Sequence, residues 1–156
     1  MADKTNAVRL VQQAKIKCRE AFYEFDENDL NGNHAAAAVG MPPEQVFKTL
    51  VARGDRTGIN VFCIPVCCEL DLKKAAKATG NKKIEMVAVK ELLGLTGYIR
   101  GGCSPVGMKK KYPTFFDETC ILWDEIAVSA GARGHQMILP PDGLANLVGA
   151  KLVDLT

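Results

Sequence analysis

The sequence is poor in aromatic and histidine side chains and has no long apolar run. Aromatic residues make up 6% of the 156 residues, and there are two histidines. So few rings argue against a nucleic-acid platform that stacks many bases. No segment approaches the ~18 apolar residues of a membrane-spanning helix, and Met1 to Thr5 are not followed by the apolar stretch of a secretory signal. We therefore expect a cytoplasmic protein without a membrane partner.

Recognisable catalytic and metal-binding motifs are also lacking. His34 and His135 are isolated, which argues against a Ser-His or Cys-His enzyme. The cysteines stand at positions 18, 63, 67, 68, 103 and 120. Their mostly apolar neighbours are typical of reduced, buried thiols. A zinc site on the cysteines at 63, 67 and 68 is a weaker alternative, because no second close Cys or His pair accompanies them, and a redox role is another. We expect no metal and no cofactor.

What is present resembles an average soluble domain. Apolar residues make up 47% and charged residues 24% of the chain, and the formal net charge is +2. This mildly basic balance permits contact with a phosphate backbone without requiring it. The length fits one domain, so residues 1–156 are expected to form a single domain.

Helix and strand patterns alternate along the chain. Helices are expected after Thr5 and over 34–39, 70–79, 89–95 and 140–148, and strands over 21–25, 47–51, 59–64, 84–87, 112–116, 125–129, 136–139 and 151–155. The nearly continuous apolar run Ile59 to Ile64 is typical of a central strand covered on both faces. The pattern predicts a mixed sheet with several short helices, although the alternation alone would favour a parallel α/β sheet.

A glycine-rich loop, Thr96 to Gly107, separates two of these segments and contains four glycines and one proline. Such a loop can expose successive N–H groups that hold an anion or a developing oxyanion. Taken alone, a tight connection between two strands is the better interpretation, because glycine-rich turns are common.

Several ordered motifs resemble the YbaK family of aminoacyl-tRNA deacylases, and the Cys-tRNA(Pro) deacylase type in particular. The similarity runs from about Thr5 to the C-terminus and rests on Gln45-Val46-Phe47-Lys48-Thr49-Leu50, Pro65-Val66, Leu70-Asp71-Leu72-Lys73-Lys74, Ala76-Lys77, Gly80, Lys82-Lys83, Glu85-Met86, Thr96-Gly97-Tyr98, Gly101-Gly102, Ser104-Pro105, Gly107 and Lys109-Lys110. The resemblance implies an α+β fold, a single domain with a mixed, barrel-like β-sheet flanked by short helices. It also implies editing of mischarged tRNA in trans, similar to the editing domain of prolyl-tRNA synthetase.

The chemistry that the resemblance implies needs no nucleophile from the protein. The thiol of the attached cysteine would attack its own ester in Cys-tRNA(Pro), or in Cys-tRNA(Cys), and the N–H groups of Gly101 and Gly102 would receive the carbonyl oxygen. Neither Cys103 nor Ser104 has an activating base nearby in the sequence. The family's signature lysine falls on Lys48, which the sequence alone would describe as an edge lysine with its amine in water.

Further roles also follow from the resemblance. Residues expected to bind the substrate are Tyr23, Thr49, Ser104, Pro105, Ser129 and Gly131. Residues expected to follow the tRNA are Lys73, Lys74, Lys109 and Lys110, although a solvated face explains these lysines equally well. The resemblance implies mischarged tRNA as a partner, with prolyl-tRNA synthetase as a further candidate partner and no DNA.

Two positions depart from the family pattern. Asn31 replaces an aromatic residue found in many relatives, and the Cys-editing type has an acidic residue near the position of Gln136. Motifs do not decide which amino acid fits a pocket, so deacylation of Ala-tRNA(Pro) or of a broader set stays open. A module that binds tRNA or a synthetase without cleavage is the alternative from another class.

Overall fold

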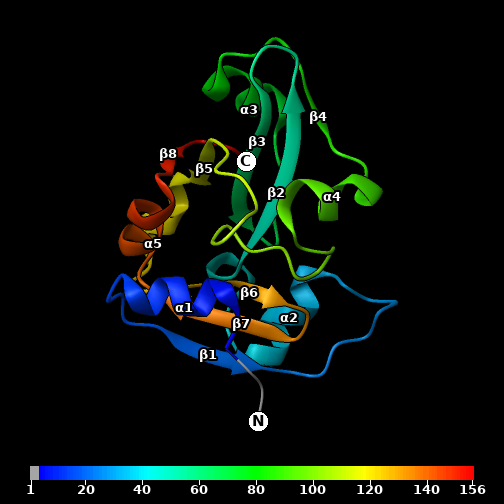
Figure 1. Ribbon diagram of the computed structural model, residues 1–156. Coiled ribbons are helices and arrows are strands. Elements are labelled where there is room, and N and C mark those ends of the chain that lie inside the picture. Colours follow the sequence, from blue (N-terminus) through cyan, green and yellow to red (C-terminus); the bar gives the residue numbers. More distant parts are fainter. Residues whose placement is uncertain (1–3) are drawn as a thin grey trace.

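The computed structural model describes residues 4–156 and has an α+β fold with two β-sheets (Figure 1). The helices are α1 Asn6–Gln13, α2 Gly32–Val39, α3 Leu72–Thr79, α4 Val89–Thr96 and α5 Pro141–Val148, with short 3₁₀ helices η1 Pro43–Gln45 and η2 Glu118–Leu122. The strands are β1 Arg19–Phe22, β2 Phe47–Gly54, β3 Gly58–Pro65, β4 Ile84–Met86, β5 Thr114–Asp117, β6 Ile126–Ala132, β7 His135–Leu139 and β8 Lys151–Val153.

Helix ends follow local signals in the sequence. The Thr5 hydroxyl accepts a hydrogen bond from the Val8 N–H and so caps α1. The α2 and α3 helices stop at Gly40 and Gly80, which both adopt the left-handed conformation that glycine tolerates best. The predicted helices are therefore present, with ends within a few residues of the expected ones.

The larger sheet has five strands in the order β4-β2-β3-β5-β8. The β2–β3 and β2–β4 pairs are antiparallel, whereas β3–β5 and β5–β8 are parallel. The β3 strand lies in the centre and is buried from Asn60 to Pro65, which confirms the expectation for the apolar run Ile59 to Ile64. The smaller sheet is antiparallel, in the order β1-β7-β6.

The two sheets do not close into the barrel-like sheet that was expected, although the α+β class is confirmed. In residues 4–156, one isolated bridge, Val46 with Ala127, pairs their backbones. The Gln45 side chain adds a 2.9 Å hydrogen bond to the Glu125 carbonyl. Beyond this bridge β2 and β6 are not paired in the described residues, and a cleft lies between the two sheets.

The first strand ends earlier than predicted, at Phe22 rather than Phe25. Its partner β7 begins at His135, so the ladder runs out after the hydrogen bond from the Tyr23 N–H to the Gly134 carbonyl. Tyr23 and Phe25 are thereby released from the strand.

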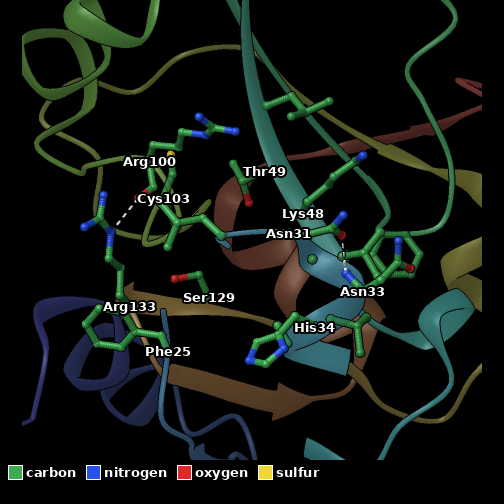
Figure 2. Close-up of a pocket in the computed structure, with 18 of the residues that line it drawn as sticks. Phe25, Asn31, Asn33, His34, Lys48, Thr49, Arg100, Cys103, Ser129 and Arg133 are labelled. Atoms are coloured by element: carbon green, nitrogen blue, oxygen red, sulfur yellow. Dashed lines mark hydrogen bonds between the residues drawn. The ribbon is translucent and has the colours of Figure 1, made fainter. Parts of the chain in front are cut away.

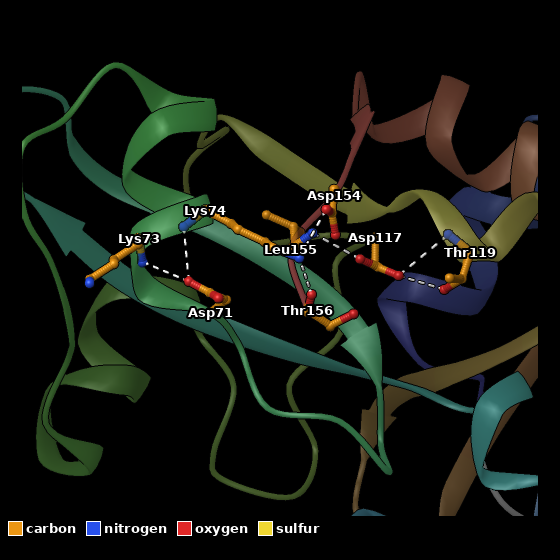
Figure 3. A network of polar contacts seen from close by, with 8 residues as sticks. All are labelled: Asp71, Lys73, Lys74, Asp117, Thr119, Asp154, Leu155 and Thr156. Atoms are coloured by element: carbon orange, nitrogen blue, oxygen red, sulfur yellow. Dashed lines mark hydrogen bonds and ion pairs between the residues drawn. The ribbon is translucent and has the colours of Figure 1, made fainter.

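A shared core joins the sheets, and a polar network fixes the C-terminal segment. The largest apolar cluster contains Phe47 and Phe116 from the larger sheet and Val128 and Met137 from the smaller one. In Figure 3, the buried Asp117 carboxylate accepts hydrogen bonds from the Leu155 N–H and from the Thr119 hydroxyl. Since Leu155 is itself fully buried, these contacts hold the chain end against the larger sheet.

Candidate active site

A cleft of about 870 Å³ opens where the two sheets diverge (Figure 2). Its lining comes from β2, β6 and β7, from the start of α2 and from the loop around Gly101. Tyr23, Lys48, Thr49, Gly101 and Ser129, all expected at the site, are among the lining residues. The fold thus brings together five candidates that are far apart in the sequence.

Hydroxyl groups from both sheets face one part of the cleft. Figure 2 shows Thr49 of β2 and Ser129 of β6 pointing into the same space. The Ser129 hydroxyl oxygen accepts a hydrogen bond from the Gly131 N–H at 3.2 Å. Its own proton therefore remains available for a ligand. Gly131 itself does not line the cleft but sits against the Tyr98 ring with a φ of +101°, and its contribution is to hold Ser129.

Gln136, which belongs to a departure from the family pattern, lines the cleft and is buried. It pairs with Ser129 across β6 and β7 and is 6% exposed. Its amide N–H₂ is 3.5 Å from the Tyr23 hydroxyl. Its carbonyl oxygen Oε1 is buried and has no hydrogen-bond partner among residues 4–156. An unpaired buried acceptor is costly, so this oxygen is poised to accept a hydrogen bond from a bound molecule.

Lys48 projects from β2 toward the side of the cleft formed by the start of α2. Successive strand residues point to opposite faces, and in Figure 2 the Lys48 amine lies on the Asn31 and Asn33 side, whereas Thr49 points toward Ser129. The side chain is half-buried and makes no ion pair within residues 4–156. Asn31, the other departure from the family pattern, caps α2 by accepting a hydrogen bond from the Asn33 N–H. An unpaired cation on a flexible stem is thus available to an anionic ligand.

The glycine loop contributes less backbone to the cleft than its composition predicts. Gly101 lines the cleft, and no hydrogen bond to its N–H is found in residues 4–156. Gly102 is buried outside the lining, and its N–H already donates to the Ile99 carbonyl at 3.0 Å. The N–H of Gly102 is therefore not free to receive a substrate carbonyl in this structure.

Ser104 and Pro105 also lie outside the cleft. Ser104 is fully buried, and its hydroxyl accepts a hydrogen bond from the Val106 N–H within the loop. Pro105 lines a separate cavity of about 280 Å³ together with Leu10 and Leu147. These two residues shape the loop rather than the cleft.

Buried thiols beside the cleft are poor nucleophiles. Burial raises the pKa of Cys103 to about 11 and the pKa of Cys63 to about 12. Both are therefore protonated near neutral pH, and a thiolate is the reactive form. All six cysteines are free, and no three metal-binding side chains cluster in residues 4–156.

The lysines expected to follow tRNA do not line the cleft. Lys74 is engaged at 2.9 Å by Asp154 and also reaches the Thr156 carbonyl (Figure 3). Hydrogen bonding to Asp154 raises the pKa of Lys74. Lys73 and Lys109 are exposed, and Lys110 lines the smaller cavity.

Two arginines and a phenylalanine that line the cleft were not predicted from the sequence, namely Arg100, Arg133 and Phe25. Arg100 lies inside the glycine-rich loop, and Arg133 stands between Ala132 and Gly134 in a tight turn. A cation within a turn that is rich in small residues was the available signal.

Within residues 4–156, no helix has the length and apolarity needed to cross a membrane.

This α+β domain has a polar cleft between its two sheets, and the cations in the lining suit an anionic or strongly polar ligand. The family model described as the aminoacyl-tRNA editing domain matches residues 32–147, and the chain belongs to that family. The resemblance noted in the sequence is thereby confirmed.

Two curated proteins and one solved structure are similar to this chain. A protein of Enterococcus faecalis named as a candidate Cys-tRNA(Pro)/Cys-tRNA(Cys) deacylase, EbsC, is 46% identical over 153 residues, which cover 98% of this chain and 93% of that protein. The uncharacterised protein YwhH of Bacillus subtilis is 23% identical over 83% of this chain and 82% of its own length. The crystal structure of a candidate trans-editing enzyme for prolyl-tRNA synthetase superposes with a TM-score of 0.81 at 28% identity, covering 99% of both chains.

Proposed function

We propose that this protein is an aminoacyl-tRNA deacylase that edits in trans and cleaves the ester of Cys-tRNA(Pro), and also of Cys-tRNA(Cys). The observation that carries the proposal is the single cleft that gathers Tyr23, Lys48, Thr49, Gly101 and Ser129. The Enterococcus faecalis relative, nearly half identical along almost the whole chain, bears a name with the same two substrates.

The reaction uses the substrate's own thiol. Its sulfur forms a bond to the ester carbonyl carbon, the bond from that carbon to the ribose oxygen breaks, and the thiol proton passes to the ribose oxygen. The released cyclic thioester takes up water to give free cysteine. Because burial raises the pKa of Cys103 and Cys63, neither of these two thiols supplies the nucleophile.

The chain's own groups hold and polarise the substrate. Gly101 offers a free N–H to the carbonyl oxygen, and the Ser129 hydroxyl has a proton to donate. Lys48 stabilises negative charge on the bound substrate, and Tyr23 and Thr49 shape the pocket around the amino acid. The Gln136 oxygen accepts a hydrogen bond from the α-ammonium group.

The Lys48→Ala variant tests this proposal. We expect kcat/KM for Cys-tRNA(Pro) to fall at least about 100-fold, because a cation that stabilises negative charge on the bound substrate is lost. The melting temperature should not change, since Lys48 has no ion pair in the described part of the chain. Release of amino acid from purified charged tRNA measures the effect.

The exposed Lys151 of β8, outside the cleft, supplies the matched control. Lys151→Ala should deacylate like the wild type. Unchanged activity of Lys48→Ala contradicts the role of Lys48, and a wild type that cleaves no charged tRNA contradicts the function.

A panel of charged tRNAs separates the remaining alternatives. Faster cleavage of Ala-tRNA(Pro) than of Cys-tRNA(Pro) points to a positioned water, because alanine has no thiol. Salt-sensitive tRNA binding without release of amino acid indicates a module that binds without cleaving. We further propose that the protein is cytoplasmic and that residues 1–156 form one editing domain. We also propose prolyl-tRNA synthetase as a partner, and co-purification of the two proteins at low salt tests this.

A further inference from the structure

Two arginines on one wall of the cleft have no firm anionic partner among residues 4–156. The Arg133 Nε donates a 2.9 Å hydrogen bond to the Arg100 carbonyl, which links the β6–β7 turn to the glycine loop. The nearest carboxylate, that of Glu27, lies 3.9 Å from Arg133 and is 78% exposed. The Arg100 guanidinium makes no ion pair within residues 4–156. Two cations held at one wall without a close carboxylate favour binding of an anion there.

The glycines of the loop make this arrangement possible. A Cβ on Gly102 would lie 3.1 Å from the Arg133 backbone nitrogen and 3.2 Å from the Ala132 carbonyl carbon. Gly101 has a φ of +85° and packs against the Arg133 side chain. The loop therefore contacts the β6–β7 turn backbone to backbone, and this contact sets Arg100 beside Arg133.

An exposed aromatic ring lies on the same wall. Phe25 is 45% exposed and lines the cleft, and it packs over Gly134, directly after Arg133. In Figure 2, Phe25 lies next to Arg133, and Arg100 extends above the cleft toward Thr49. Guanidinium groups match phosphate oxygens in two-pronged geometry, and an exposed ring can stack on any base.

We propose that the wall formed by Phe25, Arg100 and Arg133 binds the unpaired 3′ end of the aminoacylated RNA. The guanidinium groups contact phosphodiester oxygens, and the Phe25 ring stacks on a base, while the ester occupies the cleft. This assignment rests on the proposed function. Because it uses phosphate and base stacking, recognition at this wall does not depend on sequence.

The test compares Arg133→Met and Arg100→Met with Arg56→Met. Arg56 is an exposed arginine in the β2–β3 turn, outside the cleft, and its replacement removes the same charge. With a charged tRNA as substrate, each cleft variant should raise KM about tenfold and reduce the dependence of log KM on log salt by about one. Arg56→Met should match the wild type in both measurements.

A second substrate locates the effect. A 3′-aminoacyl adenosine has the ester but no phosphodiester, so the cleft variants should raise its KM by a clearly smaller factor than the KM of the charged tRNA. Equal KM and salt dependence for Arg100→Met, Arg133→Met and Arg56→Met overturns the proposal even when the wild type is active. If Arg133→Met folds poorly, the exposed Arg100 decides the outcome. A wild type inactive on both substrates overturns the proposed function together with this assignment.

Discussion

The Gln136 carboxamide illustrates how a single buried atom can point to a ligand. Its oxygen is unpaired within residues 4–156, in a cleft that also contains the hydroxyls of Tyr23 and Ser129. Leaving a buried acceptor unpaired costs about 1–3 kcal/mol. This loss of stability occurs at a position where a hydrogen-bond donor of the substrate can pair with the oxygen.

Replacing Gln136 with methionine separates binding from stability. Gln136→Met keeps the side chain's length and removes the unpaired acceptor, so the free energy of unfolding should stay equal or rise by up to about 1 kcal/mol. The KM for Cys-tRNA(Pro) should rise about tenfold, because a hydrogen bond to the α-ammonium group is lost. Urea unfolding and deacylation kinetics measure the two effects. An unchanged KM would show that the Gln136 oxygen does not contact the substrate.

Among the elements, the glycine loop and the β6–β7 turn depend on each other. Gly102 allows main chain to approach main chain, whereas Gly94 lies within α4 and a Cβ there would meet nothing within 4 Å. The two glycines thus offer a matched pair, one required by a close contact and one not.

Gly102→Ala should destabilise the protein by about 1–3 kcal/mol, because the atoms it meets belong to the backbone and cannot rotate away. It should also raise KM for charged tRNA, since Arg100 and Arg133 move apart. Gly94→Ala should instead stabilise the protein by about 0.5–1 kcal/mol through improved helix propensity. Thermal and urea unfolding provide the comparison, and equal stability of the two variants would refute the close contact.

For the molecule as a whole, the shared core makes the two sheets depend on each other. Apolar side chains from both sheets form one cluster, and Trp123, the single tryptophan, packs against it. Unfolding either sheet would expose core residues of the other.

We therefore expect one cooperative unfolding transition. Tryptophan fluorescence follows the shared core, and far-ultraviolet circular dichroism follows all helices and strands. The two urea curves should coincide in midpoint and slope. Separate midpoints would show that residues 1–156 do not behave as one domain.

Local signals along the chain were enough to predict the helices, the central strand and the family. Thr5, Gly40 and Gly80 act on backbone groups a few residues away, so their effects are visible locally. The apolar run Ile59 to Ile64 predicts a strand covered on both faces, because nearly all of its side chains are apolar. The ordered motifs indicated the editing-domain family, and with it the Lys48 and Thr49 positions in the cleft.

How the sheets meet and which polar groups are free depends on contacts between distant parts of the chain. The separation of β2 from β6, the unpaired Gln136 oxygen and the contact of Arg133 with Arg100 all join residues that are distant in the sequence. The Gly102 N–H was predicted to receive the substrate carbonyl. It donates instead to the Ile99 carbonyl, because of the path that the loop follows. Periodicity and local motifs report neighbours along the chain, whereas burial and hydrogen-bond pairing depend on neighbours in space.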